Sequence, residues 1–444
     1  MSRVKKNFCR ECANRRVRLA HSRIRGLNSN IGMQYDVIIV GAGPAGSTAG
    51  MALKDRGYKV LMIDKSIFPR DKFCGGGLSR RVIKRFPFLA ESIHSIPLHD
   101  VQNVCIASPN GITAYEQRKE PIYFMIRRRD FDTMLLKRCR NNGIDVLEGQ
   151  RVTRLIRKTD SIEVLVHTGQ KFSGKLVIGA DGVHSVIAKQ SGLNPGWNAD
   201  EIAIDFMEES SYQHFHLNER KTMYVFYGYN ASDGYGYVFP KKDHVNIGIG
   251  FLKNFYQKSQ QKPYETYKQF VGFLNKHGFV EGTPQRRNFH GFFLPLGGPL
   301  HKTFTDRVLL CGDAAGFVNA FTGEGIYYAM VSGEHAANTA MQALRYDNFR
   351  ETVLSNYQKS WRGEIGQELK LSVKIQKELF ARIHLVDTIV KAAKNNPPLR
   401  RALTDYTIGE LDYSDLKRKV LLHFTPIYLK YKIQKFVRFI RQAK

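Results

Sequence analysis

The stretch Tyr35-Asp-Val-Ile-Ile-Val-Gly-Ala-Gly-Pro-Ala-Gly46 decides how this chain folds. Its first half is an apolar run typical of a buried strand, and the glycine turn after it leads into a helix predicted over 47–56, which Gly57 ends. Gly41 permits the tight turn, Gly43 lets backbone N–H groups approach a pyrophosphate, and Gly46 lets helix and strand pack closely. The order strand, glycine turn, helix predicts a dinucleotide-binding unit.

A second predicted strand, Tyr58 to Ile63, ends in Asp64. This acid follows the turn by about 20 residues, the distance at which a carboxylate accepts the ribose hydroxyls of a dinucleotide. Strand, helix and distal acid are therefore all present at the expected offsets. The fingerprint alone does not choose between FAD and NAD.

Composition places the chain among globular proteins of more than one domain. Its 444 residues predict two or three domains at about 150 residues each, and 43% hydrophobic and 24% charged residues are typical of a folded, water-soluble protein. No apolar stretch approaches the ~18–20 residues of a spanning helix. Six scattered cysteines favour a reducing compartment over a disulfide framework, and the N-terminus lacks the apolar core of a secretory signal.

The net charge of +28 is concentrated at the two ends of the chain. Residues 1–32 carry +8 and residues 416–444 carry +9, which leaves an ordinary basic surface for the body. Basic chains bind nucleic acids, anionic membrane surfaces or acidic substrates. If the chain binds such an anionic partner, the charge distribution predicts that the two terminal segments make the contact.

The first segment, residues 1–33, shows neither helical nor strand periodicity and is predicted to be a disordered basic extension. It is a solvated tail, an Arg-rich organelle-targeting segment, or sequence upstream of the true start, since Met33 stands just before the first strand. Cys9 and Cys12 form a single C-x-x-C pair without further ligands for zinc. We expect no metal.

The last segment, Ile427 to Lys444, places apolar residues at helical spacing with Lys and Arg on the other faces. Such a helix either lies on anionic lipid headgroups or packs on the body with a solvated face. Upstream of it, Asn395-Asn-Pro-Pro398 predicts a break in an otherwise helical region that begins near Glu351.

Two further strands each end in an acid. Lys175 to Ala180 runs into Asp181-Gly182, and Arg307 to Cys311 runs into Gly312-Asp313. The second is followed by Gly323-Glu-Gly-Ile326, which opens a helix. Ligands of parallel sheets bind at these carboxyl ends of strands.

Together with Arg128-x-x-Phe-Asp132, this set resembles the flavoprotein group that includes the aromatic hydroxylases. The resemblance implies FAD, with its pyrophosphate on the first motif and Asp313 near the ribityl chain. The helix after Gly325 would then point its positive end at the flavin, where an anionic reduced flavin gains from the dipole.

Within that group, the segment Phe68 to Ser79, with Cys74-Gly-Gly-Gly77, looks like the cysteine-glycine segment of the geranylgeranyl reductase family. Tyr235-Gly-Tyr-Val-Phe-Pro240 resembles that family's Tyr-x-Trp-x-Phe-Pro motif, and 312–330 is the most specific match. The resemblance covers roughly residues 35–333. Tyr237 departs from the family by standing where Trp is usual, and Ala320 by standing where Pro is usual.

The resemblance implies an FAD-dependent reductase that saturates isolated C=C bonds of a prenyl chain on a membrane lipid, a prenylquinone, a pigment side chain or a prenyl diphosphate. The rival hypothesis is an FAD-dependent aromatic-ring hydroxylase. A third hypothesis, a nucleic-acid-binding protein acting through its basic ends, leaves the flavin motifs unexplained. No second nucleotide fingerprint appears, so we expect NADPH that binds transiently, or reduced ferredoxin, as electron donor.

The residues expected at the site follow from these motifs. Cys74 is a candidate acid, a redox switch or a small residue beside the flavin, and Tyr235 and Tyr237 are candidate proton donors. The aromatic residues Tyr224, Phe226, Tyr227, Tyr235, Tyr237 and Phe239 form either a substrate wall or strand core. Expected substrate contacts are Tyr235, Tyr237, Phe239 and Pro240. Expected cofactor contacts are Gly41, Gly43, Pro44, Ala45, Gly46, Asp64, Lys65, Cys74, Gly75, Gly76, Arg128, Val152, Asp181, Gly182, Gly312, Asp313, Gly323, Gly325 and Ile326.

The predicted architecture is α/β. A discontinuous Rossmann-like FAD-binding domain (34–194 and 299–350) is interrupted by a mostly antiparallel sheet domain for the substrate (195–298), which part of 95–125 joins. A helical C-terminal region (351–444) follows. The expected location is the cytoplasm. If the substrate is a lipid, we expect peripheral association with a membrane, and in a photosynthetic eukaryote we expect the plastid.

Overall fold

The computed structural model describes residues 34–229, 234–380, 384–412 and 415–423. The predicted basic extension, the Cys9–Cys12 pair and the predicted helix at 427–444 lie outside these ranges. Within the described ranges, none of the helices combines the length and the apolarity that a membrane span requires. In the same residues, no cluster of three or more His, Cys, Asp or Glu side chains is arranged to bind a metal ion.

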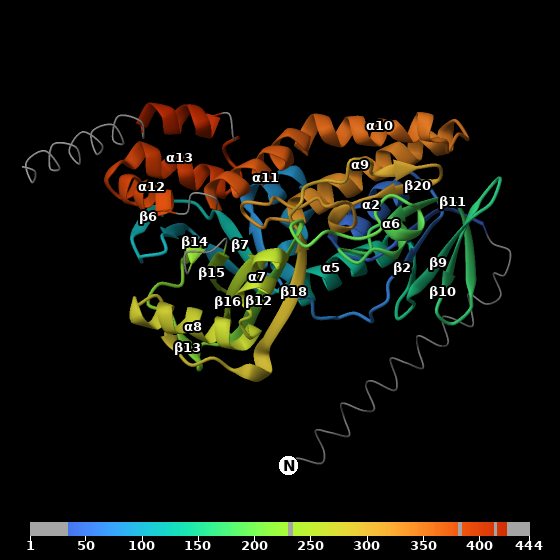
Figure 1. Cartoon of the computed structure of the whole chain (residues 1–444). Coiled ribbons are helices and arrows are strands. Elements are labelled where there is room, and N and C mark those ends of the chain that lie inside the picture. The colour runs from blue at the N-terminus through green and yellow to red at the C-terminus, as the bar shows by residue number, and fades with distance from the viewer. Residues whose placement is uncertain (1–33, 230–233, 381–383, 413–414, 424–444) are drawn as a thin grey trace, which may run out of the picture.

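The quoted stretch forms the centre of an eight-stranded sheet within the described residues (Figure 1). Strand β1 (Gln34–Val40) pairs in parallel with β2 (Val60–Ile63) and β11 (Lys171–Gly179). The order is β19-β20-β11-β1-β2-β8, and β9 and β10 form an antiparallel ribbon on β11. The core strands are continuous apolar runs because helices cover both faces of the sheet. The other members are β8 (Asp145–Leu147), β9 (Val152–Arg157), β10 (Ile162–Val166), β19 (Phe304–Thr305) and β20 (Val308–Leu310).

The helix of the fingerprint, α2 (Pro44–Lys54), lies against the long helix α9 (Ile326–Arg345). It begins three residues earlier than predicted, at Pro44, because proline is preorganised for the first turn of a helix. Gly333 allows the close approach, since a Cβ there would lie 2.2 Å from the Ala45 carbonyl oxygen. Helix α5 (Arg128–Asn141) packs beside α2, and α10 (Glu351–Trp361) lies along α9.

A seven-stranded sheet lies beside the first one (Figure 1), in the order β18-β12-β16-β15-β14-β5-β6 among the described residues. Every pair is antiparallel except β14 with β5. Strands β5 and β6 come from a segment that precedes α5 in the chain, whereas the other five strands follow it. The bounds are β5 (Asn103–Ala107), β6 (Thr113–Gln117), β12 (Ile202–Ser211), β14 (Thr222–Tyr229), β15 (Gly234–Pro240), β16 (His244–Leu252) and β18 (Phe289–Pro295).

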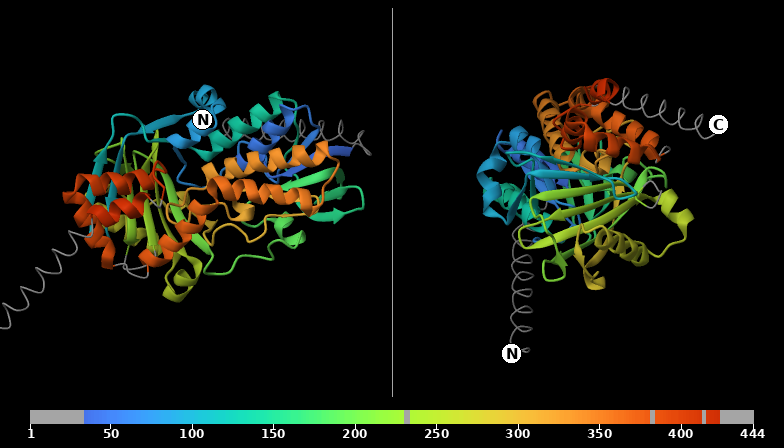
Figure 2. Two further views of the ribbon diagram at one scale, coloured as in Figure 1. Left: turned by 90° about the horizontal axis from the view of Figure 1, so that it is seen from above. Right: turned by 90° about the vertical axis from the view of Figure 1, so that its left-hand side faces the viewer.

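Different helices cover the two faces of this second sheet (Figures 1 and 2). Helix α8 (Pro263–Lys276) packs on one face through Phe270 and Leu274. On the opposite face α12 (His384–Asn395) and α13 (Pro397–Thr407) pack through Val390 and Leu399. The break between these two helices falls at Asn396, within the predicted Asn395–Pro398. Helix α11 (Gln367–Phe380) connects them to α10 through a short π-helical turn, Arg362–Gly366.

A separate three-stranded sheet has the order β3-β7-β4, and its strand β7 contributes Ile126 to the core of the first large sheet and Met125 to that of the second. It carries the segment after the cysteine-glycine motif. The fold class is as predicted, while the domain limits given above stay a prediction. The remaining elements are β3 (Gly77–Ser79), α3 (Arg80–Arg85), α4 (Phe88–Ser92), β4 (Leu98–Val101), β7 (Tyr123–Ile126), α6 (Val186–Gln190), β13 (Phe215–His216), α7 (Lys253–Ser259) and β17 (Glu281–Gly282), with 3-10 turns at Ile93–Ser95, Arg286–Asn288 and Gly312–Ala315.

Candidate active site

The glycine turn at the end of β1 combines two closely packed glycines with one open position. Gly41 has a φ of +107°, and a Cβ on Gly46 would lie 1.9 Å from the Gly41 carbonyl oxygen. At Gly43 a Cβ would meet nothing nearer than Arg70 Nη2, at 3.8 Å. Among the residues that the structure describes, the N-terminus of α2 has no side-chain cap, and the helix begins with Pro44 and Ala45. The turn thus has room for an anion at Gly43.

Asp64 ties the end of β2 to the same turn. Its Oδ2 accepts a hydrogen bond from the Ala42 N–H at 2.8 Å, and its Oδ1 accepts one from the Ser66 N–H at 2.8 Å. Lys65, next to it, is exposed. Val152 is buried at the start of β9. A ribose contact by Asp64 stays a prediction, as do cofactor contacts by Lys65 and Val152.

Arg128 forms a buried charged group with Asp132 and Arg70. Its Nε and Nη2 donate to the two oxygens of Asp132 at 2.7 and 2.8 Å, and Arg70 Nη2 donates to the same carboxylate at 2.8 Å. Burial alone would raise the pKa of Asp132, but the charge of Arg128 and its hydrogen bonds lower it. Two guanidinium groups on one carboxylate leave a net positive charge beside Gly43. That charge fits a pyrophosphate. Arg70 lies within the quoted segment Phe68 to Ser79 but was not among the expected cofactor contacts.

The two later acids have different surroundings. Asp181 caps α6, since its Oδ2 accepts from the N–H groups of Val186 and Ile187 at 2.7 and 3.2 Å, and Gly182 beside it has a φ of +84°. Asp313 instead lies 3.3 Å from Lys72 Nζ, on the cysteine-glycine segment. The Gly312 N–H before it donates to Ser332 Oγ on α9. Asp313 therefore lies between that segment and α9.

A cavity opens between the cysteine-glycine loop and the N-terminus of α9. Within the described residues the N-terminus of α9 has no side-chain cap, and its first residues, Gly325 and Ile326, line this space. The structure brings nine of the predicted residues together in the wall: Cys74, Gly75, Gly76, Tyr235, Tyr237, Phe239, Gly323, Gly325 and Ile326. Pro240 and the predicted residues of the glycine turn are not among the lining residues. Apolar side chains outside the quoted motifs complete the wall: Phe251, Phe292, Leu294 and Leu296. Ala320 and Phe321 also line it; they lie within the 312–330 match but were not among the expected site residues.

The aromatic stretch of β14 and β15 divides between the two faces of its sheet, because successive side chains on a strand point in opposite directions. Tyr224 and Phe226 face α8, where Phe226 packs edge-on against Phe270 at 5.5 Å. The substrate-wall alternative was therefore wrong for these two residues. On the cavity side, the Tyr227 ring stacks on the Phe321 ring at 4.8 Å.

Tyr237 reaches across a neighbouring strand to a buried acid on the strand beyond it. It stands opposite Gly248 of β16, and the missing side chain there leaves space for the Tyr237 ring. The Tyr237 hydroxyl consequently donates to Asp205 Oδ2 of β12 at 2.9 Å. Burial raises the pKa of Asp205 to about 7, and the hydrogen bond from Tyr237 opposes that rise. Asp205 belongs to none of the sequence motifs.

We expect Gly248→Ala to displace the Tyr237 ring, since a Cβ at position 248 would lie 2.2 Å from the ring Cζ and the hydroxyl oxygen. The expected cost is about 1–3 kcal/mol of unfolding free energy, measured by urea denaturation. Gly250→Ala on the same strand is the matched control, because a Cβ there would meet its nearest atom at 3.6 Å. Equal stability of the two variants would contradict this account of the Tyr237 position.

Lys241 holds the cysteine-glycine loop from behind. Its buried ammonium group donates to the Ile126 carbonyl at 2.9 Å and to the Gly75 carbonyl. Burial lowers the pKa of Lys241 to about 8, while the charge of Glu209 opposes that change. No motif identified this lysine, although its place directly after Pro240 brings it to the end of β15. Its contacts fix the backbone on which Cys74 stands.

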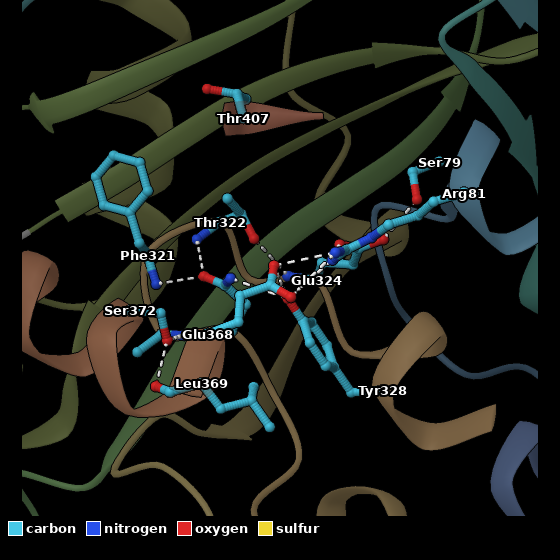
Figure 3. A network of polar contacts seen from close by, with 12 residues as sticks. Ser79, Arg81, Phe321, Thr322, Glu324, Tyr328, Glu368, Leu369, Ser372 and Thr407 are labelled. Atoms are coloured by element: carbon cyan, nitrogen blue, oxygen red, sulfur yellow. Dashed lines mark hydrogen bonds and ion pairs between the residues drawn. The ribbon is translucent and has the colours of Figure 1, made fainter. Parts of the chain in front are cut away.

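A buried ionic network supports the opposite wall of the cavity (Figure 3). Arg81 of α3 binds the carboxylates of Glu324 and Glu368, and its Nη2 also donates to the Tyr328 hydroxyl at 2.8 Å. Ser79 Oγ donates to Glu324 at 2.8 Å. Glu324 lies between Gly323 and Gly325 at the start of α9 and lines the cavity. The network therefore fixes the segment that the motif comparison placed beside the flavin.

The parallel sheet, the open glycine turn and the two uncapped helix N-termini define a dinucleotide-dependent oxidoreductase of the flavoprotein class. A family profile described as an FAD binding domain matches residues 34–359. Digeranylgeranylglycerophospholipid reductases of Methanococcus aeolicus and Methanococcoides burtonii are similar to this chain. The reductase of Methanococcus aeolicus is 30% identical, and the match covers 78% of this chain and 86% of that protein. The reductase of Methanococcoides burtonii is 29% identical, and the match covers 91% of this chain and 97% of that protein.

The chain belongs to the FAD-binding oxidoreductase family that includes these reductases. A solved structure of a geranylgeranyl bacteriochlorophyll reductase-like protein from Thermoplasma acidophilum has the same fold. The TM-score is 0.76 at 20% identity, over 90% of this chain and 99% of that one. FAD as cofactor agrees with the space at Gly43 and with the positive charge beside it.

Proposed function

We propose that this flavoprotein saturates isolated C=C bonds in the geranylgeranyl or prenyl chain of a lipid. The observation that carries the proposal is the cavity, whose aromatic and aliphatic wall lies between the cysteine-glycine loop and the N-terminus of α9. Such a wall suits a long apolar chain and excludes water from it. The names of the similar proteins support the same substrate class.

Different residues of this chain would bind the cofactor and position the substrate. The glycine turn with Arg70 and Arg128 would hold the pyrophosphate of FAD, and Asp313 with the α9 N-terminus would face its flavin side. When bound, reduced FAD supplies the hydride that saturation requires. Tyr235, Tyr237 and Phe239 would position the alkene, and the Lys241 contacts would keep the Cys74 loop in place. Cys74 remains a candidate for a direct chemical role.

The same proposal includes the lipid class of the substrate and the electron donor. A membrane lipid is the substrate we favour over a prenylquinone, pigment or prenyl diphosphate, because the similar proteins are named for a phospholipid. NADPH or reduced ferredoxin would supply the electrons. Leu421 and Leu422 are 57% and 66% exposed near Lys417, Arg418 and Lys419. Such a surface supports peripheral binding to an anionic membrane on the cytoplasmic side or, in a photosynthetic eukaryote, in the plastid.

The test is anaerobic. The flavin of the purified holoenzyme is reduced with dithionite, and a digeranylgeranylglycerol phospholipid in detergent micelles is added. We expect the flavin absorbance to return and the lipid mass to rise by pairs of hydrogen atoms. The fully saturated lipid, in the same micelles, is the matched control and should leave the flavin reduced.

An aromatic-ring hydroxylase would behave differently. Its reduced flavin would persist with every prenyl lipid and would reoxidise only with oxygen, and an aromatic compound would then gain one oxygen atom. That outcome would replace the proposed function by the hydroxylase alternative.

A further inference from the structure

Asp205 is a buried acid on the cavity wall, and it forms no ion pair with any residue that the structure describes. It is 7% exposed and lines the cavity near Phe251, Phe292 and Leu294. Its Oδ2 accepts the Tyr237 hydrogen bond, and its Oδ1 has no hydrogen-bond partner among the described residues. Ionising a carboxyl in such surroundings is costly, so this group is held in its neutral, proton-carrying form more readily than an exposed aspartate.

We propose that Asp205 is the acid that protonates the substrate alkene, and that Tyr237 is its positioning residue; this inference rests on the proposed function. Saturating an isolated double bond requires a hydride at one carbon and a proton at its neighbour. The Asp205 O–H bond breaks, and the alkene π electrons form the new C–H bond. The hydride would come from bound reduced FAD, and solvent water would later return a proton to the Asp205 carboxylate.

The Tyr237 contact suits this task. A hydroxyl that donates to Oδ2 stabilises the carboxylate formed when the proton leaves. It leaves Oδ1, which has no hydrogen-bond partner among the described residues, as the oxygen that can carry the proton. Gly248 makes the contact possible, since a side chain at that position would exclude the Tyr237 ring.

The other titratable groups of the wall suit the task less well. Burial raises the pKa of Tyr123 and Tyr235 well above 10, which makes them weaker acids. Lys72 pairs with Asp313, and Glu324 with Arg81. Cys74 Sγ accepts a hydrogen bond from the Gly76 N–H at 3.4 Å. The pKa of about 7 at Asp205 lies where a general acid works best near neutral pH.

The experiment measures single-turnover reoxidation of the reduced holoenzyme by the digeranylgeranyl phospholipid across pH 5.5 to 9. For the wild type we expect the rate to fall as pH rises through about 7, because the acid form is consumed. Asp205→Asn should lose about 100-fold or more, the usual contribution of a general acid, and should lose the pH dependence. Tyr237→Phe removes the hydrogen bond that lowers the Asp205 pKa, so its profile should shift to higher pH.

Tyr224→Phe is the matched control, because it removes a tyrosine hydroxyl from the opposite face of the same sheet. It should keep the wild-type rate and profile. If Asp205→Asn fails to fold, the upward shift of the Tyr237→Phe profile carries the test.

A second readout needs no turnover. The oxidised protein should show the infrared carbonyl band of a protonated carboxylic acid, titrating near pH 7, and the band should be absent from Asp205→Asn. An unfolded aspartate titrates near 4. Between these values the folded protein holds a proton that the unfolded chain has released, so the wild-type Tm should fall with rising pH relative to that of Asp205→Asn.

The outcomes separate the two claims. A wild type that leaves the lipid unreduced overturns both. A wild type that reduces the lipid, with an Asp205→Asn variant of equal rate and unchanged pH profile, overturns the role of Asp205 and leaves the proposed function standing.

Discussion

Gly46→Ala should destroy both the stability and the flavin content of this protein. The new Cβ would lie 1.9 Å from the Gly41 carbonyl oxygen and 3.1 Å from Ile39 Cγ2. Neither the turn backbone nor the central strand can retreat, because β1 is paired on both sides and buried. We expect a loss of about 3 kcal/mol in unfolding free energy, at the upper end for overpacked sites. Guanidinium denaturation and the flavin-to-protein absorbance ratio measure the two effects.

Gly43→Ala is the variant that separates folding from binding. Its φ of −74° suits alanine, and a Cβ there meets nothing within 3.8 Å, so we expect wild-type stability of the flavin-free protein. The methyl group would occupy the space for the pyrophosphate. Flavin affinity should fall at least about tenfold, or 1.4 kcal/mol, in a fluorescence titration. Unchanged affinity would show that the pyrophosphate binds elsewhere.

Arg81→Met should cost about 3–5 kcal/mol of unfolding free energy, the range for removing one partner from a buried ion pair. Glu324 and Glu368 would lose their shared cation, and the Glu324 side chain is only 7% exposed. The start of α9 would then be held less firmly beside the cavity. Urea denaturation measures the loss in the purified protein.

The double variant Arg81→Met with Glu324→Gln is the control for this prediction. It removes the more buried of the two uncompensated charges, that of Glu324, and keeps the shape of its side chain, while Glu368 is more exposed. The double variant should therefore recover a large part of the lost stability. If the single and double variants were equally unstable, packing of the Arg81 stem rather than charge would explain the loss.

The sequence predicted the parts of this fold that local pattern determines. The apolar run before Gly41 became the central strand, and the Asn395–Pro398 break became the boundary between α12 and α13. Both depend on residues close in the chain, where strand periodicity, glycine and proline act directly. The motifs also brought Cys74 and Gly325 into one cavity wall, because each motif stands at a fixed place in its family's fold. Their chemical roles stay predictions.

Sequence reasoning missed the contacts that depend on strand register and on helix packing. Asp205 and Tyr237 are 32 residues apart and meet only because Gly248 lies between them in the sheet. Arg81 and Glu324 are separated by 243 residues. An acid inside the apolar run Ile202 to Met207 was the available signal for Asp205. Without knowledge of how this strand pairs in the sheet, the Asp205 side chain could equally have faced solvent.

The parallel pairing of β14 with β5 limits how this protein can be recombined with its relatives. A chimera that exchanged only 202–295 would leave β5 and β6 of the host beside foreign strands, with apolar side chains shaped for another partner. Exchange of substrate preference between relatives therefore requires 103–117 to move with 202–295. The same constraint applies if the segment 202–295 was acquired in evolution as an insertion. The protein that received it would have had to supply β5 and β6, which complete the seven-stranded sheet.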